Sequence, residues 1–337
     1  MKIGPVDSDQ QVLIVAEIGN NHEGSFALAE ELIGRAAATG VDAVKFQTFI
    51  PEHYVSRDQS DRLQRLRKFA FSFEQFSKLA KSANQQGLQF FSTPFDLASA
   101  DALTLFCPAI KISSGDNNFF PLIERVASFM KPVILSSGLA NFSELDQARS
   151  RLSRIWCERG HEGELALLHC VSSYPTPPEA ANLAAIRTLS DHFKDCTIGY
   201  SDHTLGIDAA VVSVGLGARI IEKHFTLRKD FSDFRDHQLS ADPAEMTELV
   251  RRVRLAEELL GTGRKEVSEL EEPNRLAMRR SIAAARNIDA GSTLRQDDLT
   301  WVRPGGGFAP GEEALVVGRT LAQDVLLGQV FRQSDFR

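Results

Sequence analysis

The feature that most limits the fold of this chain is a regular alternation of short apolar segments with longer helical patterns. The apolar segments are rich in β-branched and aromatic residues, and they occur at 12–19, 42–49, 88–95, 109–116, 131–138, 165–172, 196–203 and 219–226. In the first intervening stretch, "SFALAEELIGRAAATG", Ser25 is suited to cap a helix. The apolar residues of that stretch fall on one side of such a helix: Leu28, Leu32, Ile33 and Ala36. Eight strand-then-helix units predict a (β/α)8 TIM barrel. An open doubly wound sheet is the alternative, and it suits fewer strands.

Nearly every predicted strand ends in polar or charged side chains. They are Glu17, Lys45, Gln47, Ser92, Thr93, Lys111, Ser114, Ser136, Ser137, Ser172, Ser173, Ser201 to His203 and Glu222 to His224. In a parallel barrel the carboxyl ends of all strands meet on one face, where barrel enzymes build their active sites. A single strand can end in polar residues because it reaches solvent, but eight in succession favour one shared site.

The composition restricts the kinds of partner. The chain has 337 residues, which suits one large and one small domain, and its net charge is −7. That charge argues against nucleic acid as the main partner, because neutralising phosphates requires a basic surface. No apolar run is long enough to cross a bilayer, and the N-terminal "MKIGPVDSDQ" lacks the apolar core of a signal peptide. Four cysteines without a Cys-x-x-Cys pair favour free thiols. We therefore expect a cytoplasmic protein that binds neither nucleic acid nor a membrane.

The strand–helix pattern ends near residue 261. The segment 261–276 combines glycines and a proline with dense charge, which predicts a linker between a barrel domain at 1–260 and a small β-rich domain at 277–337. Within the small domain, "ARNIDAGSTLRQDDL" (285–299) aligns without gaps with "AQDVLLGQVFRQSDF" (322–336). This internal repeat predicts two pseudo-symmetric halves.

His203 and His224 stand at the ends of two predicted neighbouring strands. Because adjacent strands lie about 4.8 Å apart, both imidazoles can reach one metal ion. Two nitrogen ligands with carboxylates nearby favour an open divalent-metal site that water and substrate complete. The alternative is a pair of hydrogen-bonded histidines without a metal.

Lys45, Lys111 and Lys223 interrupt otherwise apolar segments. A lysine in such a position must reach an anion or escape to solvent. Hydroxyl groups occur at the same strand ends, at Ser114, Ser136 and Ser201. Together they predict a pocket for phosphate or carboxylate groups. The alternative is structural pairing of the lysines with carboxylates, among them Glu17, Asp116 and Glu222.

Two loops carry further candidates. His22, in "GNNHEGS" (19–25), either contacts a substrate or caps the loop. Arg303 precedes Pro304 and three consecutive glycines in "RPGGG" (303–307), and it is either solvated or part of a site. The sequence alone does not say where this loop points.

Many segments, in order along the chain, resemble motifs of the sialic acid synthase family, which comprises N-acetylneuraminate synthase and its relatives. They are "AEIGNNHEGS", "GVDAVKFQTF", "FFSTPFD", "KISSGD", "KPVILSSG", "LLHCVSSYPTP", "IGYSDHTLG" and "IEKHFTL". In addition, "RRSIAAARNIDAGSTLRQDDLTWVRPGGG" resembles the start of the family's C-terminal antifreeze-like (SAF) domain. The resemblance covers nearly the whole chain. It implies a TIM barrel followed by an SAF domain, with phosphoenolpyruvate and an amino sugar such as N-acetylmannosamine as substrates. The implied products are a nine-carbon 2-keto acid and phosphate, and the implied cofactor is Mn²⁺ or Mg²⁺.

The resemblance also implies roles for individual residues. The metal ligands would be His203 and His224. The phosphoenolpyruvate contacts would be Lys45, Thr93, Lys111, Ser114, Ser136 and Ser201. Sugar-side or catalytic residues would be Glu17, Gln47, Tyr174 and Asp236, with Glu17 or Asp116 as the carboxylate that moves protons. Arg303 matches an arginine that reaches the partner subunit's active site in a domain-swapped homodimer.

The departures from the family pattern fall mostly on the sugar side. Asp116 stands where some members have Glu, and "DFSDFRDHQLS" replaces a commoner Pro-Gly-Pro-Asp-His loop. The segment 54–70 lacks an Asn that some members offer the sugar. The resemblance therefore indicates the reaction type more firmly than the sugar, and synthesis of legionaminic or pseudaminic acid is the alternative. Two other functions fit the residues alone: a Schiff-base aldolase that uses Lys111 or Lys223, and a carbohydrate-binding protein without catalysis.

Overall fold

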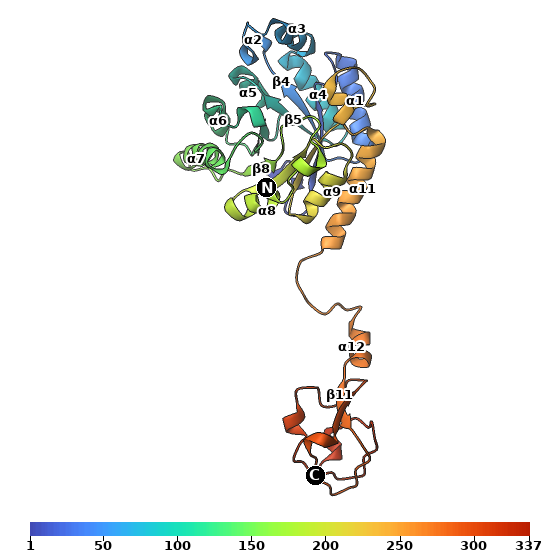
Figure 1. Ribbon diagram of the computed structural model, residues 1–337. Coiled ribbons are helices and arrows are strands. Elements are labelled where there is room, and N and C mark those ends of the chain that lie inside the picture. The colour runs from blue at the N-terminus through green and yellow to red at the C-terminus, as the bar shows by residue number, and fades with distance from the viewer. The chain divides into compact units, whose positions relative to one another are not determined.

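The computed structural model describes residues 1–337, which fall into two compact units, Met1–Gly261 and Thr262–Arg337. The first unit is built around eight parallel strands surrounded by helices (Figure 1). The strands are β3 (Leu13–Gly19), β4 (Ala43–Thr48), β5 (Gln89–Pro94), β6 (Ile110–Ile112), β7 (Val133–Ser136), β8 (Leu165–His169), β9 (Thr197–Asp202) and β10 (Ile220–His224). Each lies within one of the eight segments predicted from the sequence.

The eight strands form one sheet in the order β5-β4-β3-β10-β9-β8-β7-β6, and every pair in it is parallel. The strands at the two ends of this order, β5 and β6, also lie side by side. The sheet is therefore wrapped into a nearly closed barrel. This confirms the TIM-barrel prediction and excludes the open doubly wound sheet.

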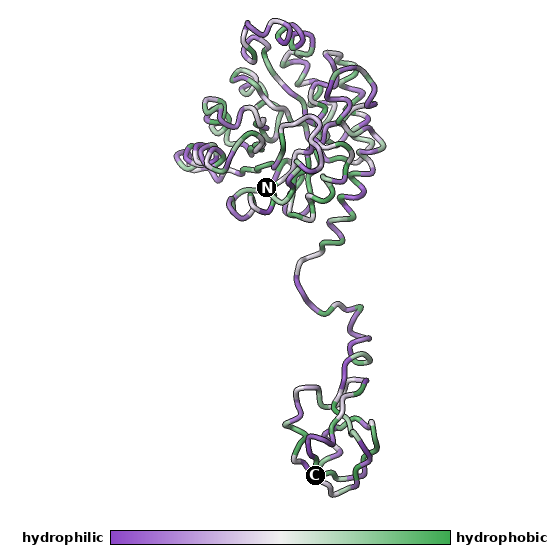
Figure 2. Tube along the Cα trace, viewed as in Figure 1, coloured by the Kyte–Doolittle hydropathy of each residue, from purple (hydrophilic) through white to green (hydrophobic).

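Helices cover the outside of the barrel. They are α1 (Phe26–Ala38), α4 (Phe73–Gln85), α5 (Leu97–Leu103), α6 (Phe120–Ala127), α7 (Phe142–Glu158), α8 (Ala185–His192), α9 (Asp208–Gly215) and α11 (Pro243–Leu260). Ser25 caps α1, because its side chain accepts a hydrogen bond from the Leu28 amide. Both polar and apolar residues occur along these helices (Figure 2), as expected for amphipathic helices on a core. None of the helices is both long and apolar enough to cross a membrane.

The barrel strands bury side chains on both faces. Outward-facing residues such as Ile14 and Val44 belong to the core shared with the helices, whereas Leu13 and Val15 point into the barrel. The N-terminal hairpin of β1 (Lys2–Ile3) and β2 (Val6–Asp7) adds Met1 and Ile3 to the inner core. Because side chains alternate along a strand, the inward face of β3 continues from Leu13 and Val15 to Glu17. The same alternation brings polar groups inward at the carboxyl end of the other strands.

Shorter helices lie in the connections after the strands. They are α2 (Pro51–Tyr54) and α3 (Ser60–Phe69) after β4, the 3-10 helix η1 (Ser114–Asp116) after β6, η2 (Pro178–Ala180) after β8, and α10 (Arg235–Leu239) after β10. These connections follow the carboxyl ends of their strands, so they lie on the face where a barrel carries its site.

The second unit has its own core and two matching halves. It contains α12 (Glu272–Met278), the antiparallel strands β11 (Ser281–Ala284) and β12 (Leu299–Val302), and the 3-10 helices η3 (Gln296–Asp298), η4 (Glu313–Leu315) and η5 (Gln333–Asp335). In one repeat the Asp298 carboxylate accepts from the Arg295 amide at 2.9 Å, and in the other Asp335 accepts from the Arg332 amide at 2.7 Å. The repeat detected in the sequence is therefore present in the structure.

Candidate active site

A cavity of about 460 Å³ lies at the carboxyl ends of the barrel strands. It gathers thirteen of the site residues expected from the sequence: Glu17, Lys45, Gln47, Thr93, Lys111, Ser114, Asp116, Ser136, Tyr174, Ser201, His203, His224 and Asp236. The strand pattern explains this convergence, because each barrel strand contributes its last inward-facing side chains to the same space.

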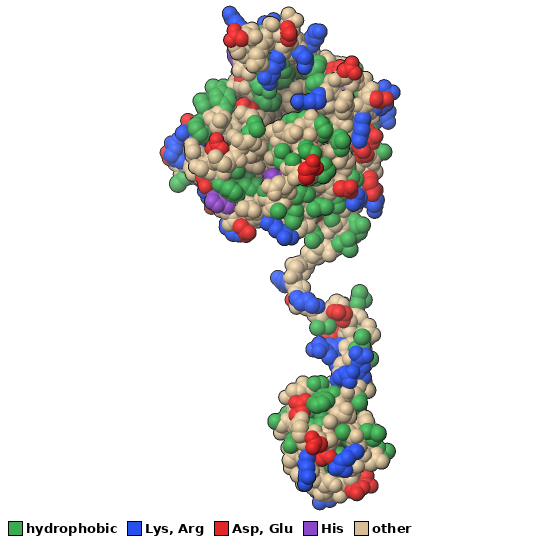
Figure 3. Space-filling view, in the orientation of Figure 1, with side chains coloured by type: hydrophobic (Ala, Val, Ile, Leu, Met, Phe, Trp, Pro, Cys, Tyr) green, Lys and Arg blue, Asp and Glu red, His purple; other side chains and the backbone are tan.

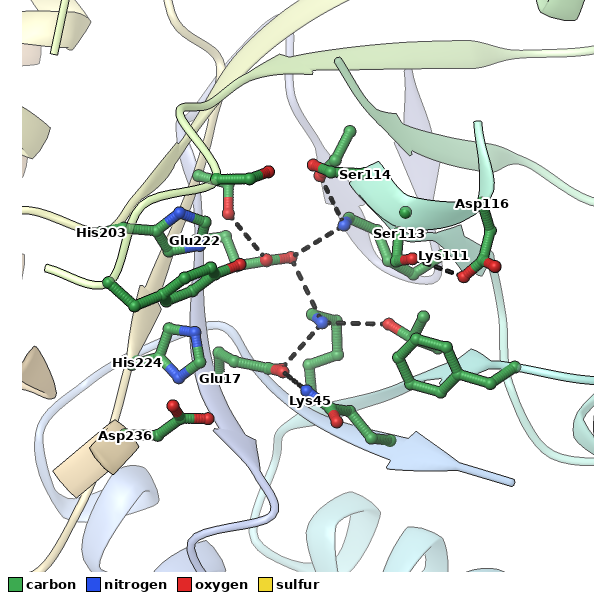
Figure 4. A pocket seen from close by; sticks show the side chains of 18 of the residues that line it. Glu17, Lys45, Lys111, Ser113, Ser114, Asp116, His203, Glu222, His224 and Asp236 are labelled. Atoms are coloured by element: carbon green, nitrogen blue, oxygen red, sulfur yellow. Dashed lines mark hydrogen bonds and ion pairs between the residues drawn. The ribbon is translucent and has the colours of Figure 1, made fainter. Parts of the chain in front are cut away.

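The floor of the cavity is a buried network centred on Glu222 (Figure 4). One Glu222 oxygen lies 3.6 Å from the Lys45 ammonium and 3.7 Å from the Lys111 ammonium, and the other accepts from Ser201 Oγ at 2.9 Å. Lys45 also pairs with Glu17 at 2.8 Å, and Lys111 donates to Ser136 Oγ at 2.7 Å. Two ammonium groups are thereby held a short distance apart, with hydroxyl groups beside them.

The two carboxyl groups of this network have opposite protonation preferences. Burial raises the pKa of Glu17 to about 7, although the Lys45 ammonium pulls it down. Burial would also raise the pKa of Glu222, but the ammonium groups of Lys111 and Lys45 lower it to about 2. Glu222 is therefore a permanent anion, whereas Glu17 can gain or lose a proton near neutral pH.

Asp116 lies on the opposite side of the cavity from the histidines in Figure 4. Burial raises the pKa of its carboxyl group, and a hydrogen bond from Ser113 and the charge of Lys111 oppose that rise. Its carboxylate accepts from Ser113 Oγ at 2.5 Å. Asp116 is thus a second carboxyl group in the cavity, but it is tied to its own loop.

His203 and His224 lie side by side on neighbouring strands, with 5.6 Å between their ring centroids. His203 Nδ1 donates to the Val171 carbonyl at 2.8 Å, which leaves Nε2 as a free acceptor. His224 Nδ1 is buried without any hydrogen-bond partner. Burial lowers the pKa of His203, and it lowers the pKa of His224 to about 3. Both imidazoles are therefore neutral at physiological pH, which is the form that binds metal ions.

These histidines fit a divalent metal as an open, two-nitrogen site. No cluster of three or more His, Cys, Asp or Glu side chains is arranged to hold a metal ion. A metal bound by His203 and His224 would therefore need oxygen ligands from water or substrate. The unpartnered Nδ1 of His224 is the observation in favour of a ligand, because an unpaired buried nitrogen is costly.

One wall of the cavity is formed by the loops after β8 and β10. The Tyr174 ring lies 4.2 Å from the His203 ring, and the Arg235 guanidinium stacks over Tyr174 at 4.7 Å. Asp236 is buried beside Arg235, with 3.2 Å between Arg235 Nε and its carboxylate. His237 anchors this loop, since its Nε2 lies 3.0 Å from the carboxylate of Glu23. The wall combines an aromatic face with acidic and basic groups, which suits a polar ligand with several hydroxyl or amide groups.

The structure corrects one expectation about the lysines. Lys223 does not enter the cavity, because alternation along β10 turns it outward while Glu222 and His224 point inward. Its ammonium pairs with Asp202 at 2.9 Å and donates to the Thr204 carbonyl at 2.5 Å. Both side chains are fully buried. Lys223 is therefore a structural residue, and neither an anion ligand nor a Schiff-base lysine in the cavity.

Sequence reasoning misses some residues of the cavity. It treats Glu222 only as a structural partner, although its position two residues before His224 places it on the same inward face. Arg62 in α3, Tyr54 in α2 and Arg235 in α10 also line the cavity. They come from the connections after β4 and β10, where strand periodicity does not predict which side chains point inward.

The loop at 19–25 has a structural role. His22 is fully buried and stacks on Phe71 with 4.3 Å between ring centroids, and its Nδ1 accepts from the Gly24 amide at 3.1 Å. The side-chain amide of Asn21 donates to the Phe225 carbonyl at 2.8 Å. His22 is therefore the loop cap rather than a substrate contact. Arg303 belongs to the second unit, where it follows β12 and is exposed.

Comparisons with known proteins agree with this geometry. The model of the NeuB family matches residues 32–265, and that of the SAF domain matches residues 279–337. The chain is 38% identical over 340 residues to the N,N'-diacetyllegionaminic acid synthase of Legionella pneumophila, covering 97% of this chain and 95% of that one. It is 34% identical over 351 residues to a pseudaminic acid synthase of Campylobacter jejuni, covering 100% of both. A crystal structure of the N-acetylneuraminic acid synthetase of Leptospira borgpetersenii matches with a TM-score of 0.76 and 33% identity, over 81% of this chain and 94% of that one.

Proposed function

This chain belongs to the NeuB family and ends in a SAF domain, and we propose that it condenses phosphoenolpyruvate with the open-chain aldehyde of an N-acetylated hexosamine. The products are a nine-carbon 2-keto sugar acid and inorganic phosphate. The acceptor is N-acetylmannosamine or a diacetamido hexose, and the latter would give acids of the legionaminic or pseudaminic type, as in the named relatives. The carrying observation is one cavity that holds two buried lysines beside two neutral imidazoles.

Lys45 and Lys111 bind the two anionic groups of phosphoenolpyruvate. Their ammonium groups are the strongest donors on the cavity floor, and the hydroxyls of Thr93 and Ser136 lie within hydrogen-bond distance of them, at 3.1 and 2.7 Å. Glu222 keeps both lysines charged and at a fixed spacing. Burial lowers the pKa of Lys111, and the Glu222 carboxylate opposes this effect. The enol ester is therefore positioned before the acceptor arrives.

His203 and His224 hold the divalent metal, with Mn²⁺ or Mg²⁺ as the proposed ion. When bound, the metal supplies Lewis-acid polarisation of the acceptor aldehyde. The two imidazoles are ready for this role because burial keeps them neutral. Tyr174, Gln47 and Asp236, which line the same cavity, contact the sugar.

The reaction forms a carbon–carbon bond between C3 and the aldehyde carbon and a carbon–oxygen bond from water to C2, and it breaks the carbon–oxygen bond between C2 and the phosphate. C3 of phosphoenolpyruvate attacks the aldehyde carbon, and positive charge develops at C2, where carboxylates of the cavity stabilise it. Water adds at C2, and the resulting tetrahedral intermediate expels phosphate. Glu17 is the proposed proton carrier, because its pKa of about 7 allows it to accept the proton of the attacking water and to give a proton to the former aldehyde oxygen, which becomes a hydroxyl group. Asp116 is the alternative carrier, although its hydrogen bond to Ser113 restricts it.

We also propose roles for the second unit and for the linker before it. We assign catalysis to residues 1–260, a linker to 261–276 and the SAF domain to 277–337. Arg303 of the SAF domain contacts the sugar in the active site of a partner subunit, within a domain-swapped homodimer in the cytoplasm. The support for this is the SAF match together with the family motif that contains Arg303.

A phosphate-release screen tests the proposed function. Purified protein is incubated with phosphoenolpyruvate, Mn²⁺ and a panel of N-acetylated hexoses and 2,4-diacetamido sugars. We expect phosphate release that requires both an aldose and the metal, and its absence with every aldose would contradict the proposal. Borohydride treatment with pyruvate should trap no adduct, whereas a lysine adduct would favour the aldolase. Sugar binding that survives His203→Ala with His224→Ala, without turnover by the wild type, would favour a binding protein.

A further inference from the structure

Two arginines line the outer part of the cavity, and the proposed chemistry at its floor does not use them. Arg62 comes from α3 after β4, and Arg235 comes from α10 after β10. Each lies against an aromatic ring of the cavity wall, with Arg62 5.3 Å from the Tyr54 ring centroid and Arg235 4.7 Å from that of Tyr174. Stacking on a ring fixes the plane of a guanidinium and leaves its N–H edge available to a ligand.

The polar edges of these guanidinium groups are largely unsatisfied. Arg62 makes one side-chain hydrogen bond, to Gln59 at 3.2 Å, and it has no carboxylate partner. Arg235 uses only its Nε, toward Asp236 at 3.2 Å, so both of its terminal nitrogens lack a protein acceptor. By contrast, the lysines on the floor are both paired with Glu222.

A second groove continues from these arginines. It is lined by Arg62 and Arg235 and by Arg65 and Lys68 of the same helix α3, together with Glu23, Asp61 and Asp233. Those three acidic residues line the groove but not the cavity. Figure 3 shows several Lys and Arg side chains over α2 and α3. The boundary between cavity and groove is therefore formed by two cations with free N–H groups.

We propose that the acceptor aldose carries an anionic group, a phosphate or a carboxylate, at the end remote from its aldehyde, and that Arg62 and Arg235 bind this group. The inference rests on the proposed function, which places the aldehyde beside His203 and His224, and it narrows the acceptor from a neutral N-acetylated hexose to a derivative that carries this anionic group. An acceptor held there extends outward between the loops after β4 and β10, where both arginines lie. Guanidinium groups bind phosphate and carboxylate through paired N–H donors.

The test compares three acceptors: N-acetylmannosamine, its 6-phosphate, and the corresponding 6-carboxylate. Product formation is followed by mass spectrometry with phosphoenolpyruvate and Mn²⁺. We expect one of the anionic acceptors to exceed the neutral sugar in kcat/KM by about 100-fold, as two charge-assisted contacts imply. The preferred anion distinguishes phosphate from carboxylate. Isothermal titration of the protein with each sugar provides a readout that does not depend on turnover.

Variants connect the preference to the two arginines. Arg62→Met and Arg235→Met should each reduce the ratio of anionic to neutral kcat/KM by about tenfold. Arg67→Met is the matched control, because Arg67 lies on the same helix but pairs with Glu52 and lines neither the cavity nor the groove. Equal or better use of the neutral sugar, or an unchanged ratio in both variants, would overturn this inference and leave the synthase activity standing. No product from these three acceptors or from the 2,4-diacetamido sugars would overturn both.

Discussion

The buried pair of Lys223 and Asp202 allows a quantitative test of the barrel structure. The two charged groups are 2.9 Å apart, with side-chain exposures of 1% and 0%. Replacing Lys223 with Met keeps most of the side-chain volume but leaves the Asp202 carboxylate buried without a counter-ion. It also removes the donor to the Thr204 carbonyl. Breaking one side of a buried ion pair costs about 3–5 kcal/mol in the free energy of unfolding.

Two further variants test the origin of that loss. In Lys223→Met with Asp202→Asn, the Asn oxygen can still accept from the Thr204 amide, as Asp202 does at 2.8 Å, and no buried charge remains. We expect this double variant to recover most of the loss. Lys229→Met is the surface control, because the Lys229–Glu245 pair is about one-third exposed and should contribute less than about 1 kcal/mol.

The assay is urea unfolding of the barrel followed by tryptophan fluorescence. The chain has two tryptophans, Trp156 buried in the barrel and Trp301 in the second unit. In a Trp301→Phe background, Trp156 reports on the barrel alone. A loss below about 1 kcal/mol in Lys223→Met would refute the buried-pair argument. A double variant less stable than the single one would refute it as well.

The other predictions concern the ligands, pH and the second unit. Lys111→Met should lower kcat/KM for phosphoenolpyruvate by about 100- to 1,000-fold, the effect of one ammonium near an anion. The control Lys131→Met removes a lysine bound only to backbone carbonyls and should leave kcat/KM unchanged. Similar losses in both variants would contradict the role of Lys111 in binding phosphoenolpyruvate. Burial lowers the pKa of His22 to about 3, so between pH 6.5 and pH 3 only the unfolded chain takes up a proton on this imidazole. The stability that the neutral, buried imidazole contributes is therefore fully present above pH 6.5 and is lost as the pH falls. The stability advantage of wild type over His22→Asn should therefore shrink by about 2 kcal/mol from pH 7 to pH 5 in urea titrations, and a constant difference would speak against a neutral buried His22. Arg303→Ala should raise KM for the sugar more than KM for phosphoenolpyruvate, and equal effects in steady-state kinetics would count against a sugar-specific contact.

Strand periodicity is what made the cavity floor predictable. In a barrel, one register fixes which residues face inward, so Glu17, Lys45 and Lys111 converge once eight strands are recognised. The same rule, applied strictly, would also have separated Lys223 from Glu222 and His224. The error there came from treating three consecutive polar residues as one group, although neighbouring side chains in a strand point to opposite faces.

The cavity wall was less accessible to sequence reasoning. Arg62 and Arg235 lie in connections whose helices are short or exposed, and no period relates them to the barrel axis. Only the folded chain shows that their side chains reach the same space. Burial effects were likewise hidden, since the pKa of about 7 for Glu17 comes mainly from complete desolvation.

The central claim is that this cavity joins C3 of phosphoenolpyruvate to an aldose carbonyl carbon at a metal site formed by His203 and His224. In the most direct measurement, the protein and Mn²⁺ are incubated with phosphoenolpyruvate labelled with ¹³C at C3 and an aldose labelled with ¹³C at C1. The metal is then removed, and the ¹³C NMR spectrum of the product is recorded. We expect a new one-bond ¹³C–¹³C coupling, formed in step with phosphate release and lost in His224→Ala or with EDTA. Phosphate release that yields labelled pyruvate without that coupling, or coupling that persists without metal, would contradict the account.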